Sequence, residues 1–127
     1  MATISATLTL TSSNWHSDPL NIAPSASLTV EGNEQAIGRY TTAAVAAKLP
    51  VGIFDSADRK VWIYLKNLSA DSLEKIQLLE DNGGAAGNLF SILGSGEWAF
   101  FPYAENDYLW ISSASGTPVL EYGVFEV

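Results

Sequence analysis

The chain of 127 residues contains no cysteine and one histidine, His16. Without cysteine the fold holds no disulfide bond, which is consistent with folding in a reducing cytoplasm. Nucleophilic sites of the Ser–His–Asp or Cys–His type need an imidazole beside the nucleophile. His16 follows Trp15 in a polar stretch with serines on either side, so we expect a surface or loop-packing histidine. A zinc site needs three or four ligands, which no recognisable spacing supplies. We therefore predict a protein that is not an enzyme, with no catalytic, cofactor-binding or metal-binding residue.

Basic residues are also scarce. The chain has 6 Lys and Arg against 14 Asp and Glu, a formal net charge of -8. The electrostatic field of such a net negative charge repels phosphate backbones and anionic membrane surfaces. No run approaches the ~18 apolar residues that span a bilayer, and the N-terminus lacks the pattern of a signal peptide. We expect a complete, soluble chain, made in the cytoplasm, that binds neither nucleic acid nor membrane.

The acidic residues of the predicted loops match no recognised site. They lack the alternating Asp/Asn pattern, the glycine and the final glutamate of a helix–loop–helix calcium site. We interpret them as solvated turn residues and leave calcium binding open. A glycosidase needs two carboxylates across a cleft, and Glu97 beside Trp98 is the residue to examine. The loop pairs are Asp55 with Asp58, Glu80 with Asp81, and Glu105 with Asp107.

Apolar residues, in contrast, make up 47% of the chain and charged residues only 16%, which excludes a disordered chain. The stretch from Lys60 to Asn67 has five consecutive β-branched, aromatic or aliphatic residues between two lysines. This pattern is typical of a central strand, with Val61, Ile63 and Leu65 on one face and Trp62 and Tyr64 on the other. Because both faces are apolar, we predict that both are covered.

The rest of the chain predicts further strands separated by Gly, Pro and Asn turns. Residues 3–11 alternate aliphatic residues with Ser and Thr. We expect 27–31 and 35–42 to form a hairpin around Gly32 and Asn33. For 43–48 two alternatives stay open, one or two helical turns or an irregular edge, so the chain holds at most one short helical element. Asp81–Gly84 predicts a turn. Other strands are expected at 51–54, 73–79, 89–93, 97–101, 108–112 and 119–125.

Strands every 8–12 residues predict an all-β fold, a sandwich, jelly roll or barrel, and we favour an antiparallel β-sandwich with a jelly-roll-like arrangement. At this length we expect one domain over 1–127. Residues 1–24 would form a strand followed by a long loop from Ser12 to Pro24, and so an arm that contacts a shell or a neighbouring subunit.

Strand parity also predicts an aromatic face and an aliphatic face in the C-terminal half. Seven aromatic side chains at ~150 Å² each amount to roughly 1,000 Å², more than a lone soluble domain exposes. That face is either internal to the fold or meets another chain, and both alternatives stay open at this point. The candidate interface residues are Trp62, Tyr64, Trp98, Phe100, Tyr108, Trp110 and Tyr122.

The order of these motifs resembles small virion structural proteins of tailed bacteriophages, notably of cyanobacterial and marine phages. The similarity lies in Val61–Asn67, Gly94–Pro102, Tyr108–Ile111 and the closing Gly116–Glu126. It covers the second half of the chain well and the first half loosely. The motifs are of moderate specificity, and the family has no catalytic residues to transfer.

The resemblance implies a capsid decoration (cement) protein on the capsid exterior, made in the host cytoplasm. Its partner would be the major capsid protein, and it would form a homo-oligomer, for which a trimer is one option. A tail, baseplate or fibre component is the alternative within the virion.

From another class of protein, the alternative is a carbohydrate-binding module, which would stack sugars on exposed Trp and Tyr, with Trp15 as the first candidate. The candidate capsid-binding arm residues are Trp15, His16, Leu20 and Ile22.

Overall fold

The computed structural model describes residues 2–13, 20–30, 35–49, 61–103 and 108–127, and every structural statement below concerns these residues. They belong to two compact units. The first unit comprises residues 1–31 with Val127, and the second comprises residues 32–126. Each unit is described by itself.

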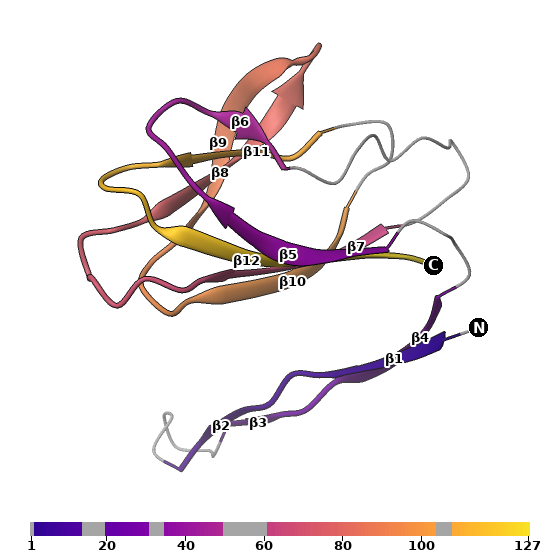
Figure 1. Cartoon of the computed structure of the whole chain (residues 1–127). Helices are drawn as coiled ribbons and strands as arrows, with labels where there is room; N and C mark the ends of the chain where they lie inside the picture. Colours follow the sequence, from indigo (N-terminus) through magenta and orange to yellow (C-terminus); the bar gives the residue numbers. More distant parts are fainter. Residues whose placement is uncertain (1, 14–19, 31–34, 50–60, 104–107) are drawn as a thin grey trace. The chain divides into compact units, whose positions relative to one another are not determined.

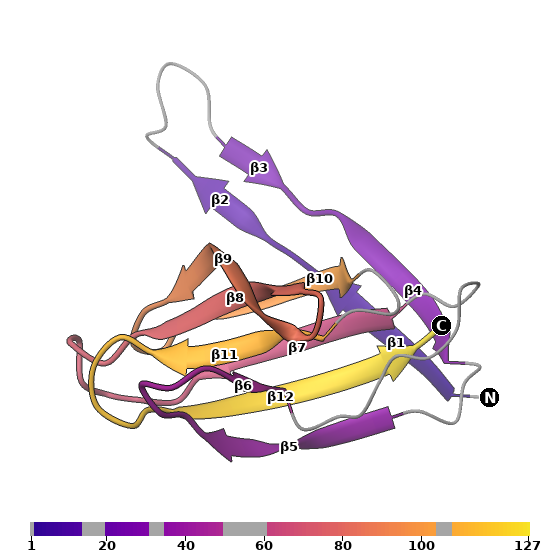
Figure 2. The ribbon, with the colours of Figure 1, turned by 90° about the horizontal axis from the view of Figure 1, so that it is seen from above.

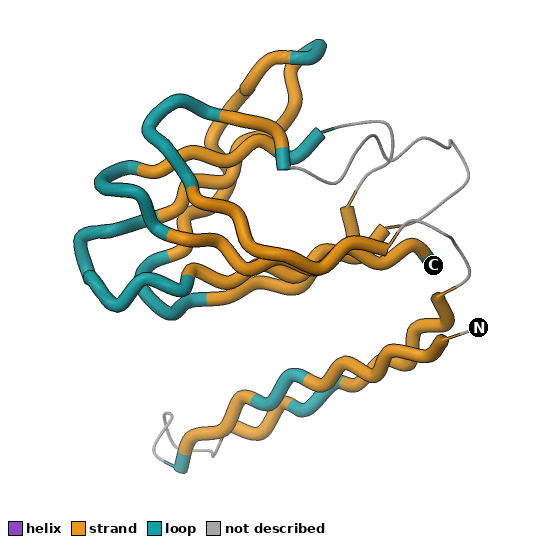
Figure 3. The backbone as a smooth tube through the Cα atoms, viewed as in Figure 1, coloured by secondary structure: helices purple, strands orange, loops and turns teal. Residues whose placement is uncertain are grey.

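All regular elements in the described ranges are strands, as the sequence predicts (Figure 3). They are labelled in Figure 1. The first unit holds β1 (Ala2–Thr7), β2 (Leu10–Ser12), β3 (Leu20–Ile22) and β4 (Ser25–Val30). The second unit holds β5 (Gln35–Thr41), β6 (Ala47–Lys48), β7 (Val61–Asn67), β8 (Ile76–Asn82), β9 (Ala85–Leu93), β10 (Trp98–Tyr103), β11 (Trp110–Ser113) and β12 (Val119–Glu126).

The second unit is an antiparallel sandwich of two four-stranded sheets (Figures 1 and 2). One sheet has the strand order β10-β7-β12-β5 and the other β6-β11-β8-β9. The prediction of a central strand is confirmed, because β7 lies between β10 and β12. Its Val61, Ile63 and Leu65 are buried, and Trp62 and Tyr64 on the opposite side are half-buried.

The core fills the space between the two sheets. Each sheet turns alternate residues inward, as the period of two requires, and each buried aliphatic side chain contributes about 1.5–3 kcal/mol of stability. The first sheet contributes Val61, Ile63, Leu65, Leu120, Tyr122 and Val124, and the second contributes Ile76, Leu78, Leu93 and Ile111, with Leu49 and Leu109 beside them.

A buried polar residue, Asn67, ends β7 and holds two turns against the core. Its side-chain amide donates hydrogen bonds to the carbonyls of Glu74 and Leu93 at 3.0 and 3.1 Å. Its Oδ1 accepts the backbone N–H of Ser69 at 3.0 Å. Asn67 is 0% exposed, so these bonds replace the water that its amide and the three backbone groups would otherwise need.

The strand β9 is irregular where it pairs with β8. Leu78 is opposite Ser91 and Leu79 is opposite Leu89, so Phe90 is an extra residue on β9. A bulge of this kind redirects a side chain. The Phe90 ring makes an edge contact with Phe101 of β10, at 6.3 Å between centroids. The two aromatic rings therefore connect the neighbouring edges of the two sheets.

Several local predictions are corrected. The expected hairpin of 27–31 with 35–42 is wrong, because β4 pairs with β1 and β5 pairs with β12. Both β1 and β4 alternate aliphatic with hydroxyl residues, and their register pairs aliphatic with aliphatic and hydroxyl with hydroxyl residues. Of the two alternatives for 43–48 the helical one is wrong: the segment bends and then forms β6, an edge strand that pairs with β11.

The β8–β9 hairpin also differs from expectation. The strand expected at 73–79 begins only at Ile76, because the Asp71 carboxylate accepts the N–H of Leu73 and turns the chain there. The turn predicted at 81–84 is reduced to Gly83 and Gly84, with φ of 63 and 90°. A two-residue hairpin loop of this type needs two positive φ angles, which glycine adopts freely. The expected turn at 32–33 and the elements expected at 51–59 lie outside the described residues.

The first unit is a two-stranded antiparallel ribbon with two chemically different faces. Alternation places small or aliphatic residues on one side and hydroxyl residues on the other. The stretch 12–24, predicted as a loop, instead includes β3, which pairs with β2. We call the two sides of the β1–β4 part the aliphatic face (Ile4, Ala6, Ala26 and Leu28) and the hydroxyl face (Thr3, Ser5, Thr7, Ser25, Ser27 and Thr29).

Candidate functional site

The register of the β10-β7-β12-β5 sheet gathers apolar side chains on its outer side. Phe100 is opposite Tyr64, which is opposite Gly123, which is opposite Ile37. The next row begins with Pro102, Trp62 and Phe125. These positions alternate with the core residues of the same strands, so they point away from the sandwich. We call the outward set the aromatic face: Ile37, Trp62, Tyr64, Trp98, Phe100, Pro102 and Phe125.

The rings of the aromatic face lie close to the sheet. Trp62 and Phe100 are stacked, with centroids 5.0 Å apart and planes at 29°. The Phe125 ring covers Gly123, since a Cβ built on Gly123 would lie 3.0 Å from Phe125 Cζ. A larger residue at 123 would lift that ring. Glycine therefore allows a low, continuous aromatic layer on the outer side of β7, β10 and β12.

Charged groups border this layer in one row. Lys66 is opposite both Trp98 and Glu121, and Glu121 is opposite Arg39. Tyr64 donates its hydroxyl hydrogen bond to Glu121 Oε1 at 3.1 Å, and Arg39 Nη2 lies 3.8 Å from Glu121 Oε2. Partial burial, then the hydrogen bond and the charge of Glu121, raise the pKa of Tyr64.

The aromatic face is not fully covered. Trp98 is 53% exposed and Ile37 is 77% exposed, while Trp62, Tyr64, Phe100 and Phe125 are half-buried. Large apolar side chains that remain in contact with water over four adjacent strands are typical of an interaction surface.

Four of the seven predicted interface residues come together here. Trp62, Tyr64, Trp98 and Phe100 share one side of the sheet, as strand parity predicts, although their part in an interface stays a prediction. Three members of the aromatic face, Ile37, Pro102 and Phe125, were missed. No local signal could have identified Phe125, because residues 119–126 are apolar on both parities and only pairing with β7 places Phe125 beside Trp62.

The placement of Tyr122 on this face is wrong. Tyr122 points into the core, is 8% exposed and lies opposite Leu65. On its other side it pairs with Gly38, where a Cβ would lie 2.7 Å from the Tyr122 hydroxyl oxygen. The missing side chain of Gly38 thus makes room for the inward Tyr122 ring.

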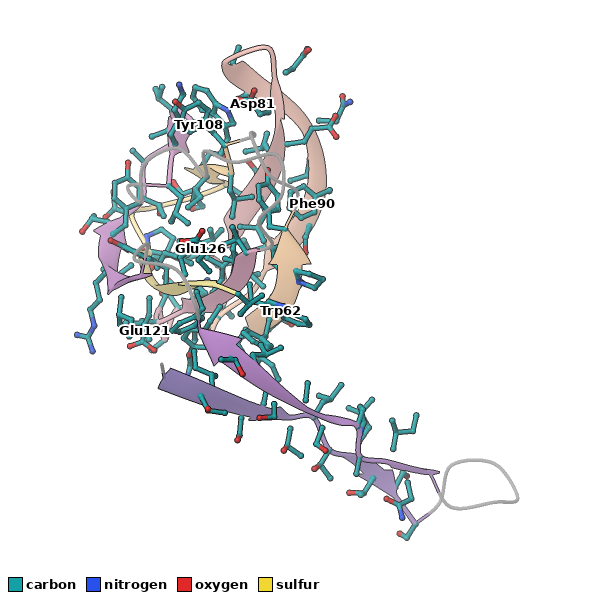
Figure 4. The ribbon with its side chains drawn as sticks, turned by 90° about the vertical axis from the view of Figure 1, so that its right-hand side faces the viewer. Trp62, Asp81, Phe90, Tyr108, Glu121 and Glu126 are labelled. Atoms are coloured by element: carbon teal, nitrogen blue, oxygen red, sulfur yellow. The ribbon has the colours of Figure 1, made fainter. Side chains whose placement is uncertain are left out.

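Tyr108 and Trp110 are also not part of the aromatic face. Trp110 belongs to β11 of the other sheet, where it is opposite Lys48 and Leu79. Its indole Nε1 donates to Asp81 Oδ1 at 2.6 Å, and Lys48 Nζ lies 3.7 Å from the Tyr108 ring centroid. Figure 4 shows Asp81 and Tyr108 at the opposite end of the unit from Trp62 and Glu121.

The contacts around Trp110 and Lys48 lower the pKa of Asp81. The Trp110 indole first, and then the Gly84 N–H and the charge of Lys48, hold the pKa of Asp81 below its ordinary value of 3.8. These donors favour the ionised carboxylate. The predicted single aromatic face therefore divides between the two sheets because β10 and β11, consecutive in the chain, enter different sheets.

The candidate arm residues belong to the first unit. Ile22, opposite Leu10 in the β2–β3 pair, is 45% exposed, and Leu20 begins β3. Trp15 and His16 lie outside the described residues.

The described residues show little that suggests catalysis or metal binding. No three His, Cys, Asp or Glu side chains gather in them. The Glu97 carboxylate accepts the Gly94 N–H at 2.6 Å and so closes its own turn. No helix in the described ranges is long and apolar enough to cross a membrane. A shallow depression of about 330 Å³ is lined by Arg39, Leu68, Ser69, Glu74, Thr117, Pro118 and Val119.

No family model matches this chain, and no curated protein does. A solved structure of Bacillus endospore appendages, described as a novel family of disulfide-linked pili, is similar to it with a TM-score of 0.57. The similarity covers 72% of this chain and 81% of the pilus chain, at 20% sequence identity. It shows a shared β fold.

Proposed function

We propose that this chain is a non-enzymatic structural protein that acts by assembly, and that the aromatic face is the surface it buries. The observation that supports this most directly is the register of seven apolar side chains on one side of one sheet. Full burial of such side chains contributes about 1.5–3 kcal/mol each. Ile37 and Trp98 are 77% and 53% exposed, so much of the free energy of burying them would be released only when a partner covers them.

In its specific form the proposal is a capsid decoration protein of a tailed phage. Its copies would join one another and the major capsid protein on the outside of the head. Support comes from the motif resemblance between residues 61 and 126, and from the net charge of -8. A negative field suits a position away from packaged DNA. A tail or fibre component remains the alternative within the virion.

The pilus similarity is compatible with assembly and constrains its chemistry. The similar pilus is described as disulfide-linked, whereas this chain contains no cysteine. These 127 residues therefore form no disulfide between copies, and we propose that burial of an apolar sheet face takes the place of such a link.

The test compares two tryptophan variants by size-exclusion chromatography with light scattering. Wild type is expected to show a mass above one chain. Trp98→Ser removes an exposed ring of the aromatic face, and we expect dissociation at about tenfold higher concentration or more, because aromatic interface anchors are often worth over 1.4 kcal/mol. Trp110→Ser is the control: it removes the Asp81 hydrogen bond, so it lowers stability but keeps the mass.

A wild-type protein that is monomeric at all concentrations would contradict the assembly proposal. Head and tail locations are separated by adding gold-labelled protein to purified particles and imaging where the label binds. Label on the heads supports the decoration protein, and label confined to tails supports the alternative.

A carbohydrate-binding module is the second candidate, favoured by the exposed ring of Trp98 beside the charged row of Lys66 and Glu121. Sugars stack on such rings and hydrogen-bond to neighbouring polar groups. If polysaccharides quench tryptophan fluorescence in wild type but not in Trp98→Ser, and the protein is a monomer, this candidate replaces the first.

A further inference from the structure

The ribbon of the first unit has one face that needs cover. Ile4 and Ala6 of β1 and Leu28 of β4 are half-buried, whereas all six residues of the hydroxyl face are exposed. An isolated two-stranded ribbon is marginally stable in water and gains stability by packing an apolar face. The aliphatic face (Ile4, Ala6, Ala26 and Leu28) is the side that can do so.

Charge makes the ribbon the part of the chain best suited to approach another copy. Residues 1–30 contain no Lys or Arg and one acidic residue, Asp18, so the other acidic residues and all basic ones follow residue 30. Two sandwich units with a net negative charge repel each other. A nearly neutral ribbon approaches such a unit without that repulsion.

The dimensions of the two surfaces agree. Six residues of β1 extend about 20 Å at 3.3 Å per residue. The strands β7 and β10 have similar lengths, of seven and six residues. Four strands spaced about 4.8 Å apart give the aromatic face a width that holds a two-stranded ribbon.

We propose that the aliphatic face of the ribbon of one copy packs on the aromatic face of a second copy. The inference rests on the proposed assembly and names both the surface and its occupant. The hydroxyl face then points outward, with Ser and Thr side chains in three cross-strand pairs available to hydrogen-bond a larger partner.

The first experiment uses two neighbouring positions on opposite faces of β4. Leu28→Asp places a charge in the proposed contact, and Ser27→Asp places the same charge on the hydroxyl face. Because an unpaired buried charge is costly, we expect Leu28→Asp to raise the dissociation concentration by at least about tenfold, which corresponds to 1.4 kcal/mol. Ser27→Asp is expected to change it by less than about threefold. Equal effects of the two variants would overturn the inference.

The second experiment uses the absence of native cysteine. Chains carrying Ala6→Cys are mixed with larger, tagged chains carrying Ile37→Cys and treated with a flexible bis-maleimide. A product containing one chain of each size is expected. In the control mixture Ser5→Cys, on the hydroxyl face, replaces Ala6→Cys and should give much less of this product.

The outcomes separate this inference from the proposal on which it depends. A multimeric mass without the mixed product overturns ribbon exchange and leaves assembly intact. A chain with both Ala6→Cys and Ile37→Cys that links only to itself, even in the mixture, also overturns it. A protein that is always monomeric overturns both.

Discussion

Asn67 offers the sharpest test of how the sandwich is held together. Replacement by leucine keeps a similar volume but removes the hydrogen bonds to the carbonyls of Glu74 and Leu93 and to the N–H of Ser69. Three backbone groups then lose this partner. The bond to the Leu93 carbonyl is buried, and the bonds to Glu74 and Ser69 are partly buried. Full burial of all three at roughly 1–3 kcal/mol each would cost about 3–9 kcal/mol. Because two of the groups are only partly buried, we expect a loss of about 3–6 kcal/mol, a large part of the 5–15 kcal/mol typical of a domain.

The assay is urea unfolding followed by tryptophan fluorescence at one fixed protein concentration, since assembly would make stability depend on concentration. Asn88→Leu is the matched control. Asn88 is exposed, and its amide bonds only to Glu80 among the described side chains, so its loss should cost about 0.5 kcal/mol or less. A loss below about 1 kcal/mol for Asn67→Leu would refute the role assigned to the network.

Asn67→Asp adds a pH-dependent check of the same network. A carboxylate at this position would face two carbonyl oxygens, so burial and these dipoles would raise its folded pKa above the unfolded value of about 3.9. Such a group has its full stability below the unfolded pKa and loses it as the pH rises through the folded pKa. We therefore expect the variant to be more stable at pH 4 than at pH 7. The opposite slope would contradict the geometry.

Two further predictions concern other sites. The pKa of Asp81 is lowered in the fold, so its stabilising contribution is present above pH 3.8 and is lost as the pH falls through the lower folded pKa. The urea midpoint of Asp81→Asn should therefore change less between pH 6 and pH 2 than the urea midpoint of wild type. Equal changes of the two midpoints with pH would argue against the Trp110 contact. Gly38→Ala should destabilise by about 1–3 kcal/mol through overpacking, because its Cβ would lie 2.7 Å from the Tyr122 hydroxyl. Adding Tyr122→Phe should recover part of that loss, and no recovery would place the strain elsewhere.

Features that depend on short stretches were predictable from the sequence. Val61–Asn67 is apolar on both parities, and β7 is accordingly a central strand with a buried and a half-buried side. The same period of two placed Trp62 with Tyr64, and Trp98 with Phe100. The all-β class follows from many such stretches separated by turns, since alternation and turn chemistry act within a few residues.

Only the tertiary structure decided which strands are neighbours. The segment 119–126 has apolar residues on both parities, so its sequence does not tell whether Tyr122 or Phe125 faces the core. That choice depends on pairing with β7 and β5, which are far away in the chain. Shifting a register by one residue exchanges the two faces of a strand, and a different neighbour places the strand in another sheet. For the same reason local patterns do not tell that Trp98 and Trp110 belong to different sheets. They also do not tell that β4 pairs with β1 rather than with β5.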